Sequence, residues 1–218
     1  MNIEKPISGA EITRKALVEA ALRLFGEKGY EAVSTREIAD HAAANIGSIA
    51  YHFGGKPGLR LACADYVMGR IRSFIGPAFA GPLPKLSPAE AVSVLEWQVE
   101  QFGRFVATSG EAKLLATFIL REVMQPGEVF QTVYSQLFKP VHERMCEIFA
   151  MATGQDAEAE EVRLATFCML GQTIYFRIGR PAIMQRMNWE DIREEEADKI
   201  VAVLKTNLRG LIAAYKKD

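Results

Sequence analysis

Apolar residues recur along most of this chain at the spacing of three and four residues that marks one face of an α-helix. The clearest case begins near Thr13, which can cap the helix, and ends at Gly29, a residue suited to a left-handed helix end. Its apolar positions are Leu17, Ala20, Ala21, Leu24 and Phe25. No segment alternates as a half-buried strand does. The pattern predicts an all-α protein of about nine helices.

Proline and glycine divide the rest of the chain. Gly54-Gly55 ends the opening part, and Ser87-Pro88 provides an N-cap followed by a residue suited to the first helical position. Further helices are expected at 58–75, 87–108, 111–124, 128–153, 157–179 and 190–216. The helix at 128–153 should be interrupted near Pro140. We expect an N-terminal three-helix unit with its arm, a connecting helix and loop, and a larger bundle. Their limits are 1–56, 57–80 and 81–218.

Residues 34–53, STREIADHAAANIGSIAYHF, indicate two short helices with almost no linker between them. Ser34 and Glu37 have the spacing of a capping box for the first helix, and Asn45 can cap the second. The connection is about two small alanines, so the helices must cross steeply, as in a helix-turn-helix. The residues expected to face inward are Ile38, Ala39, Ala42, Ile49, Ala50 and Phe53.

The second short helix carries small and polar residues where a purely structural helix would bury apolar ones. These residues are Asn45, Gly47, Ser48, Tyr51 and His52. Such side chains bind phosphates and base edges, and glycine lets a backbone approach closely. Lys56 adds a positive charge at the start of the next helix, and Arg36 lies on the outward side of the first. Tyr51 and His52 could instead simply pack at the helix end.

The overall charge neither requires nor excludes a nucleic-acid partner. The 218 residues have a net charge of −1, and 49% are hydrophobic, which is enough for a real core. Any nucleic-acid site must therefore be local. Residues 34–72 have a surplus of two positive charges, which adds little to the argument.

The cysteines and the N-terminus favour a soluble cytoplasmic protein without a membrane partner. Cys63, Cys146 and Cys168 are far apart and form no CxxC pair, as expected of buried reduced thiols. The opening residues MNIEKPISGAEIT lack the apolar segment of a signal peptide. The apolar runs are too short to cross a bilayer.

Enzyme motifs are missing from the sequence. It contains no glycine-rich loop of P-loop or Rossmann spacing, no HExxH and no GxSxG, and no histidine follows a glutamate by three residues. We therefore expect no enzyme activity, no catalytic or metal-binding residues and no cofactor. A helical interaction or ligand-carrier module remains the alternative to a DNA-binding protein, and salt-dependent duplex binding would separate the two.

Residues 13–61 closely resemble the N-terminal DNA-binding domain of TetR-type transcriptional repressors. The shared features are the A-x-x-L-F-x-x-x-G-Y helix end, the T-R-x-I-A helix, the Y-H-F-x-x-K turn and the amphipathic helix after it. The segments REVMQPGEVFQTVYSQLFKPVHERM and LGQTIYFRIGRPAIMQRMNW resemble the CerR-like regulators of this family. That resemblance implies control of transport or drug-efflux genes.

The resemblance also implies roles for matching positions. Arg36 would contact a base edge or phosphate. The residues facing the major groove would be Asn45, Ile46, Gly47 and Ser48, and those holding phosphates would be Tyr51, His52 and Lys56. Many relatives have glycine where Ala43 stands, so a left-handed Ala43 would cost about 1 kcal/mol. Many relatives have tyrosine where Ala50 stands, so the phosphate contact made by that tyrosine would be lost here or would pass to Tyr51.

The family further implies a homodimer, formed by the helices at 157–179 and 190–216, on a near-palindromic double-stranded DNA operator. Its half-sites should lie about 34–36 Å apart or at a multiple of that distance. A small-molecule effector of unknown identity would bind within residues 81–218 and release the repressor. Polar residues within apolar segments are the candidates for this contact, together with one aromatic: Arg121, His142, Gln172, Tyr175 and Arg177. Internal ion pairs or dimer contacts are the alternative.

Overall fold

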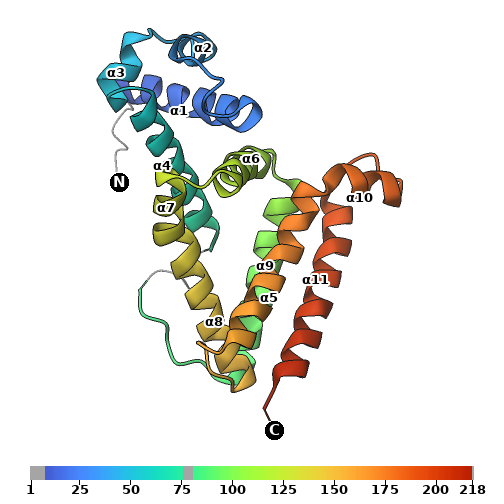
Figure 1. The fold of residues 1–218 in the computed structure, drawn as a ribbon. Coiled ribbons are helices and arrows are strands. Elements are labelled where there is room, and N and C mark those ends of the chain that lie inside the picture. The colour runs from blue at the N-terminus through green and yellow to red at the C-terminus, as the bar shows by residue number, and fades with distance from the viewer. Residues whose placement is uncertain (1–7, 76–80, 218) are drawn as a thin grey trace, which may run out of the picture. The chain divides into compact units, whose positions relative to one another are not determined.

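The computed structural model describes residues 8–75 and 81–217, and every regular element in that part of the chain is a helix (Figure 1). This confirms the all-α class. The helices divide between two compact units. Unit 1 consists of Met1–Arg70 and Leu114–Val133, and unit 2 of Ile71–Lys113 and Tyr134–Asp218. The expected division at 1–56, 57–80 and 81–218 concerns roles and stays a prediction.

The described residues of unit 1 form six helices in whole or in part. They are α1 (Gly9–Lys28), α2 (Thr35–His41), α3 (Gly47–Phe53), α4 (Lys56–Ile75), α6 (Gly110–Met124) and α7 (Glu128–Val133). The helices α4 and α6 each continue into unit 2. Its largest fully buried side chains are Leu17, Leu22, Leu24, Ile38, Ile49, Leu59, Met68 and Phe118. The short α2 and α3 therefore rest on a core supplied mainly by longer helices.

Helix α1 begins earlier than the sequence indicated. Ser8 caps it, because its hydroxyl accepts a hydrogen bond from the Glu11 backbone N–H while the Glu11 carboxylate accepts one from Ser8 N–H. The prediction that Thr13 starts the helix was wrong. Thr13 lies inside α1, where its hydroxyl donates to the Gly9 carbonyl.

Unit 2 is built around α5 (Pro88–Thr108), which packs against α8 (Lys139–Thr153), α9 (Glu160–Ile178) and α11 (Glu194–Tyr215). Ser87 caps α5 in a full capping box with Glu90, and Pro88 occupies the first turn, as predicted. The larger side chains of its buried core include Leu95, Val99, Met145, Ile148, Phe149, Met169, Ile200, Leu204 and Leu208.

The helix expected at 128–153 is interrupted, but before Pro140 rather than at it. The chain passes from α7 through a π-helical segment, η2 (Tyr134–Phe138), into α8. Pro140 has no N–H to donate to the carbonyl of Gln136 four residues earlier. A nitrogen of the Arg72 guanidinium donates to that carbonyl at 2.7 Å instead. The break is thus stabilised by a residue distant in sequence.

A further short helix, α10 (Arg180–Met187), was not expected. It follows α9 after Gly179 and ends at Asn188, which has a left-handed φ of 54°. Eight residues are too few for a clear apolar period, so the sequence pattern did not reveal it.

The three cysteines differ in exposure. Cys63 and Cys146 are buried as expected, and burial raises the pKa of the Cys63 thiol. Cys168 is exposed on α9, so the prediction of a buried thiol was wrong there. Within the described residues, no helix is both long enough and apolar enough to cross a membrane.

Candidate DNA-binding surface

The start of α2 is held to α1 by an ion pair. The Ser34 hydroxyl accepts a hydrogen bond from Glu37 N–H at 3.1 Å, which is half of the predicted capping box. The Glu37 carboxylate does not return to Ser34 but binds the Lys28 ammonium at the end of α1. This hydrogen bond with Lys28 holds the pKa of Glu37 below its ordinary value. The second half of the capping box is thus replaced by a contact between helices.

The turn between α2 and α3 contains the left-handed residue that the motif requires. Ala43 has a φ of 49°, and the Ala44 N–H donates to the Ala39 carbonyl at 2.9 Å. A side chain with a β-carbon is strained in this region by about 1 kcal/mol. The tight turn predicted from the sequence is therefore present, together with the strain expected at Ala43.

Helix α3 begins with a side-chain contact. The Asn45 carbonyl oxygen Oδ1 accepts a hydrogen bond from Gly47 N–H at 2.8 Å, which satisfies an amide of the first turn. Ile49 is buried beneath the helix, as expected. Ala50, which was also expected to face inward, is exposed, so that prediction was wrong. Tyr51, on the opposite side of the helix, is 82% exposed, and Ile46, just before the helix starts, is 49% exposed. This helix therefore presents an outer face that unit 1 does not use for packing.

The junction between α3 and α4 is very close-packed. Gly54 and Gly55 take positive φ values of 70° and 128°. A β-carbon on Gly58 would lie 1.9 Å from the carbonyl oxygen of Phe53, so only glycine fits there. The first turn of α4 thereby sets the position of the end of α3.

Two cations of α4 lie over one aromatic ring. The Lys56 ammonium is 4.2 Å from the centroid of the Tyr30 ring, and the Arg60 guanidinium carbon is 4.5 Å from it. Such contacts stabilise by about 0.5–1 kcal/mol at partly exposed sites. Lys56 is therefore held in place beside the end of α3 rather than extended freely into solvent.

The eight residues expected to contact DNA lie on α2, just before α3, on α3 and at the start of α4. Arg36, Asn45, Ile46, Gly47 and Tyr51 are exposed, whereas Ser48, His52 and Lys56 are half-buried. The Arg36 guanidinium has no ion-pair or hydrogen-bond partner among the described residues. The structure thus leaves several groups of the predicted set available, and their contact with DNA stays a prediction.

Sequence reasoning missed one cation next to this surface. The Arg14 guanidinium of α1 lies 5.4 Å from the centroid of the Phe53 ring, at the end of α3. No motif marks Arg14, because its position depends on how α1 packs beside α3. A helical-wheel comparison of the two helices would have been the available signal.

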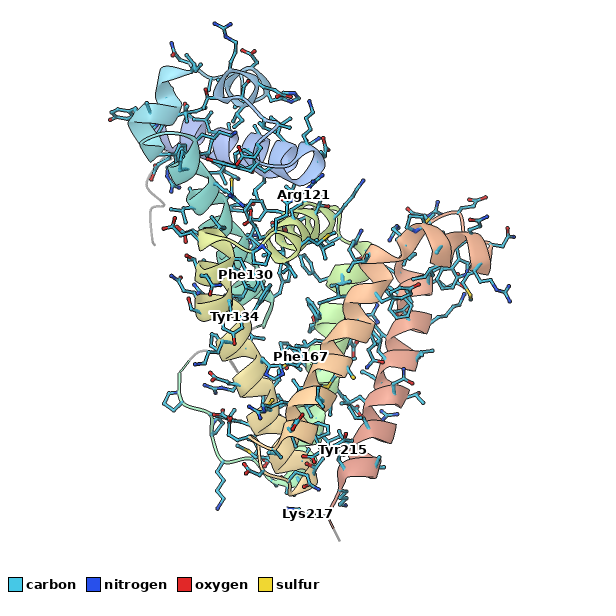
Figure 2. The ribbon with its side chains drawn as sticks, in the orientation of Figure 1. Arg121, Phe130, Tyr134, Phe167, Tyr215 and Lys217 are labelled. Carbon is cyan, nitrogen blue, oxygen red and sulfur yellow. The ribbon has the colours of Figure 1, made fainter. Side chains whose placement is uncertain are left out.

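The five residues expected to bind an effector belong to two different units, and their role stays a prediction. Arg121 belongs to unit 1, where its guanidinium binds two carbonyls of α1 (Figure 2). The other four belong to unit 2. There the carbonyl oxygen of the Gln172 side chain accepts a hydrogen bond from the Asn207 amide at 2.9 Å.

His142 lies in a small cluster between α8 and α9. Its Nε2 is 3.1 Å from the Arg163 carbonyl oxygen, and its Nδ1 is 3.7 Å from the Cys146 sulfur. The ring also stacks on Phe167 at a centroid distance of 3.9 Å. Both ring nitrogens of His142 thus face polar atoms of the protein, a carbonyl oxygen and a thiol.

Tyr175 and Arg177 occupy the end of α9. Tyr175 is exposed and lines an open, largely apolar cleft of about 460 Å³ together with residues of α10 and α11. Arg177 donates to the Ser109 carbonyl at 3.0 Å, but its Nε has no hydrogen-bond partner among the described residues. Burial, and then the neighbouring Arg180, lowers the pKa of the Arg177 guanidinium.

A second unpartnered group was missed from the sequence. Gln98 on α5 is only 7% exposed, and its amide nitrogen finds no partner within the described chain. A buried donor without a partner costs about 1–3 kcal/mol, so it marks a point where a ligand or water would be favoured. Gln98 stands between Leu95 and Val99 on the buried side of α5, and that spacing was the available signal.

A steep helix pair with a left-handed turn, and a second helix whose outer face is polar and unburied, define a helix-turn-helix DNA-binding protein. Residues 17–63 match the family described as bacterial regulatory proteins, tetR family. Residues 91–215 match the C-terminal domain of the HTH-type transcriptional dual regulator CecR. The chain belongs to the TetR family and carries a C-terminal domain of the CecR type. This is the subfamily that the C-terminal segments indicated above, where it was called CerR-like.

The full-length similarity extends over both units. The HTH-type transcriptional dual regulator CecR of Shigella flexneri is 33% identical over 197 residues, which cover 87% of this chain and 86% of that protein. The relatives are regulators of transcription. This confirms that the protein is a transcriptional regulator rather than an enzyme.

Solved structures show the same fold. A TetR-like transcriptional regulator from Rhodococcus sp. RHA1 has a TM-score of 0.66 at 21% identity, covering 91% of this chain and 95% of that one. AibR, solved in complex with isovaleryl coenzyme A and operator DNA, has a TM-score of 0.64 at 20% identity, covering 88% and 97%.

Proposed function

We propose that this regulator is a repressor that binds a near-palindromic operator as a homodimer and is released by a small-molecule effector. The observation that carries the proposal is the outer face of α3. It is exposed and polar, and it is held at both ends, by Asn45 at its start and by Gly58 at its end. A DNA-binding protein acts where the chromosome lies, so we place its action in the cytoplasm.

The proposed DNA contacts divide by chemistry. Asn45 and Ser48 carry the amide and hydroxyl groups that bind base edges, and Gly47 lets the backbone approach the major groove. Ile46 provides an exposed apolar contact for a thymine methyl group. The phosphate contacts are assigned to Arg36, Tyr51, His52 and Lys56. Only the first group should affect which sequence is preferred.

The proposed dimer surface lies on α9 and α11. Exposed apolar residues lie along much of α9, at Leu164, Phe167, Ile174, Tyr175 and Ile178. The exposed positions of α11 include small residues, at Ala202, Val203, Gly210, Ala213 and Ala214, and small side chains let another helix approach closely. A self-complementary surface of this kind forms a two-fold dimer and gives the operator its symmetry.

We place the effector within unit 2, near Gln98, whose buried amide nitrogen has no partner among the described residues. A ligand carbonyl or hydroxyl group would accept a hydrogen bond there. His142, Gln172, Tyr175 and Arg177 stay candidates, and Arg121 in unit 1 is a candidate whose donors already bind α1. AibR, with the same fold, was solved with an acyl coenzyme A thioester. The regulated genes are proposed to be those of transport or drug efflux.

Selection of duplexes from a random library at low salt tests the proposal. The full-length chain should enrich one sequence with two-fold symmetry, and its affinity should fall steeply as salt rises. Addition of candidate effectors should then lower that affinity, and Gln98→Leu should remove the response while operator binding persists. If no sequence is enriched, an interaction or carrier module becomes the better account.

A further inference from the structure

Helix α6 supplies a cap for α1. The Arg121 guanidinium donates from Nε to the Gly26 carbonyl and from Nη2 to the Glu27 carbonyl, both at 2.8 Å (Figure 2). These carbonyls lie in the last turn of α1, where no later residue of the helix can donate to them. A cation at a helix C-terminus is also favoured by the helix dipole. Arg121 thus supplies hydrogen-bond donors and a positive charge to the carbonyls at the end of α1.

The α1 side of this contact is shaped to receive α6. A β-carbon on Gly26 would lie 3.1 Å from the Thr117 methyl group, closer than ordinary packing allows. Gly29 has a φ of 86°, and a β-carbon there would lie 3.3 Å from Nη1 of Arg121. Two glycines therefore leave room for one arginine and for the helix that carries it.

The next residue of α6 makes the matching contact with α4. The Glu122 carboxylate, on a residue only 4% exposed, accepts hydrogen bonds from Nε and Nη2 of Arg60 at 2.9 and 2.8 Å. The same Arg60 guanidinium lies over the ring of Tyr30, just beyond the end of α1. Two adjacent residues thus hold the end of α1 and the first turns of α4. We call these contacts the α6 clamp.

The α6 clamp lies at the points that determine where α2 and α3 stand. The end of α1 carries Lys28, which binds Glu37 of α2. The start of α4 carries Gly58, which packs against the last residue of α3. Both neighbours of the helix-turn-helix are therefore fixed to α6, although the contacts with α1 span 94 and 95 residues of the chain and those with α4 span 62.

We propose that Arg121 and Glu122 are positioning residues for operator binding, which hold α1 and α4 so that the outer face of α3 fits the DNA. The inference rests on the proposed function, because it concerns how strongly that face binds. In this proposal the second half of α6 supports DNA binding by holding α1 and α4 in place. Neither residue touches DNA in this account.

The test compares two arginines of the same chemistry in the full-length chain. Arg121→Ala removes the clamp, whereas Arg180→Ala removes an arginine of unit 2 that likewise binds a helix carbonyl, that of Ala107, and an aspartate. Operator affinity is measured with the selected duplex at a temperature where circular dichroism shows both variants folded. Arg121→Ala should weaken binding by about tenfold or more, and Arg180→Ala by less than about threefold. Equal losses would overturn the proposal.

Two further readouts separate positioning from direct contact. Arg121→Ala should leave the slope of log affinity against log salt unchanged, since no phosphate contact is lost, whereas a slope smaller by about one would show that Arg121 itself binds DNA. Arg121→Lys, which can reach one carbonyl, should restore part of the affinity. Glu122→Gln, which keeps the shape of the side chain but loses its charge, should also weaken binding without a change in slope.

Hydrogen exchange provides a readout without DNA. Backbone amides of α2 and α3 should exchange faster in Arg121→Ala than in wild type, while Arg180→Ala leaves them unchanged. If the amides of α2 and α3 exchange at the same rate in Arg121→Ala as in wild type, the clamp proposal is overturned, even if the wild type binds its operator. If the wild type selects no duplex, the proposed function fails, and the exchange result still decides whether the clamp holds α2 and α3.

Discussion

Gly58 faces the carbonyl oxygen of Phe53 so closely that a β-carbon would lie 1.9 Å from it. The contact joins the last residue of α3 to the first turn of α4 through backbone alone, with no flexible side chain to move aside. The position of the end of α3 in unit 1 is thus set by a glycine, the smallest type of residue.

The first prediction concerns that contact. Gly58→Ala should destabilise the protein by about 2 kcal/mol or more, because backbone must move to relieve the overlap, and it should also weaken operator binding. The matched control is Gly69→Ala on the same helix, where a β-carbon meets nothing within 4 Å. That change should be neutral or stabilise by up to about 1 kcal/mol. Urea denaturation measures both, and similar values for the two variants would contradict the account.

The second prediction concerns the left-handed turn. Ala43→Gly removes about 1 kcal/mol of backbone strain, but it adds a similar loss of chain entropy on folding. The net change in the free energy of unfolding should therefore be close to zero. Ala50→Gly, at an exposed position within α3, has no strain to relieve and should destabilise by about 1 kcal/mol. Thermal denaturation of the two variants side by side checks the difference, and equal destabilisation would refute it.

Local signals made much of the site predictable. Ser87 with Glu90, the helix at the start of the chain and the steep α2–α3 pair all follow from residues within a few positions of one another. The expected strain at Ala43 was readable for the same reason, since turn geometry is a local property.

Contacts between distant residues could not be read from the pattern. Nothing near Arg121 indicates that its guanidinium would bind carbonyls 94 and 95 residues away. The same holds for Arg72, which binds the carbonyl left free by Pro140. Arg121 was singled out only as a candidate for effector contact and Arg72 not at all, because periodicity reports which face is buried but not what that face meets.

The third prediction uses the unequal burial of the Arg60–Glu122 pair. Arg60→Ala leaves the Glu122 carboxylate buried without its partner, which typically costs about 3–5 kcal/mol. Glu122→Ala should cost less, because the Arg60 side chain is more exposed and keeps its contact with Tyr30. The free energies of unfolding of both variants, from urea denaturation, test this order. The reverse order would show that the pair is not buried as described.

The fourth prediction concerns pH. Hydrogen bonds from Arg209 and Lys205 on α11 hold the pKa values of Glu96 and Glu100 on α5 below their ordinary value. A carboxylate with a lowered pKa in the folded state stabilises the protein fully above its unfolded value near 4.5. That stabilisation is lost as the pH falls through the lowered pKa.

The variant Glu96→Gln with Glu100→Gln should therefore be less stable than wild type at pH 7, by at most about 1 kcal/mol for each pair because the pairs are partly exposed. The two proteins should converge in stability as the pH falls toward 3. Glu143→Gln is the control, because its partner Lys139 lies 3.7 Å away on the same exposed helix face. Melting temperatures across this pH range test the convergence, and parallel curves would count against it.

The most direct measurement of the central claim is the affinity of the full-length chain for its selected duplex and for a scrambled duplex of equal length, over a series of salt concentrations. The account predicts a preference of about a thousandfold or more. It further predicts that Asn45→Ala reduces this preference, whereas Lys56→Ala weakens both duplexes alike and lowers the salt slope by about one. Equal affinity of the wild type for the two duplexes would contradict the claim that α3 reads DNA.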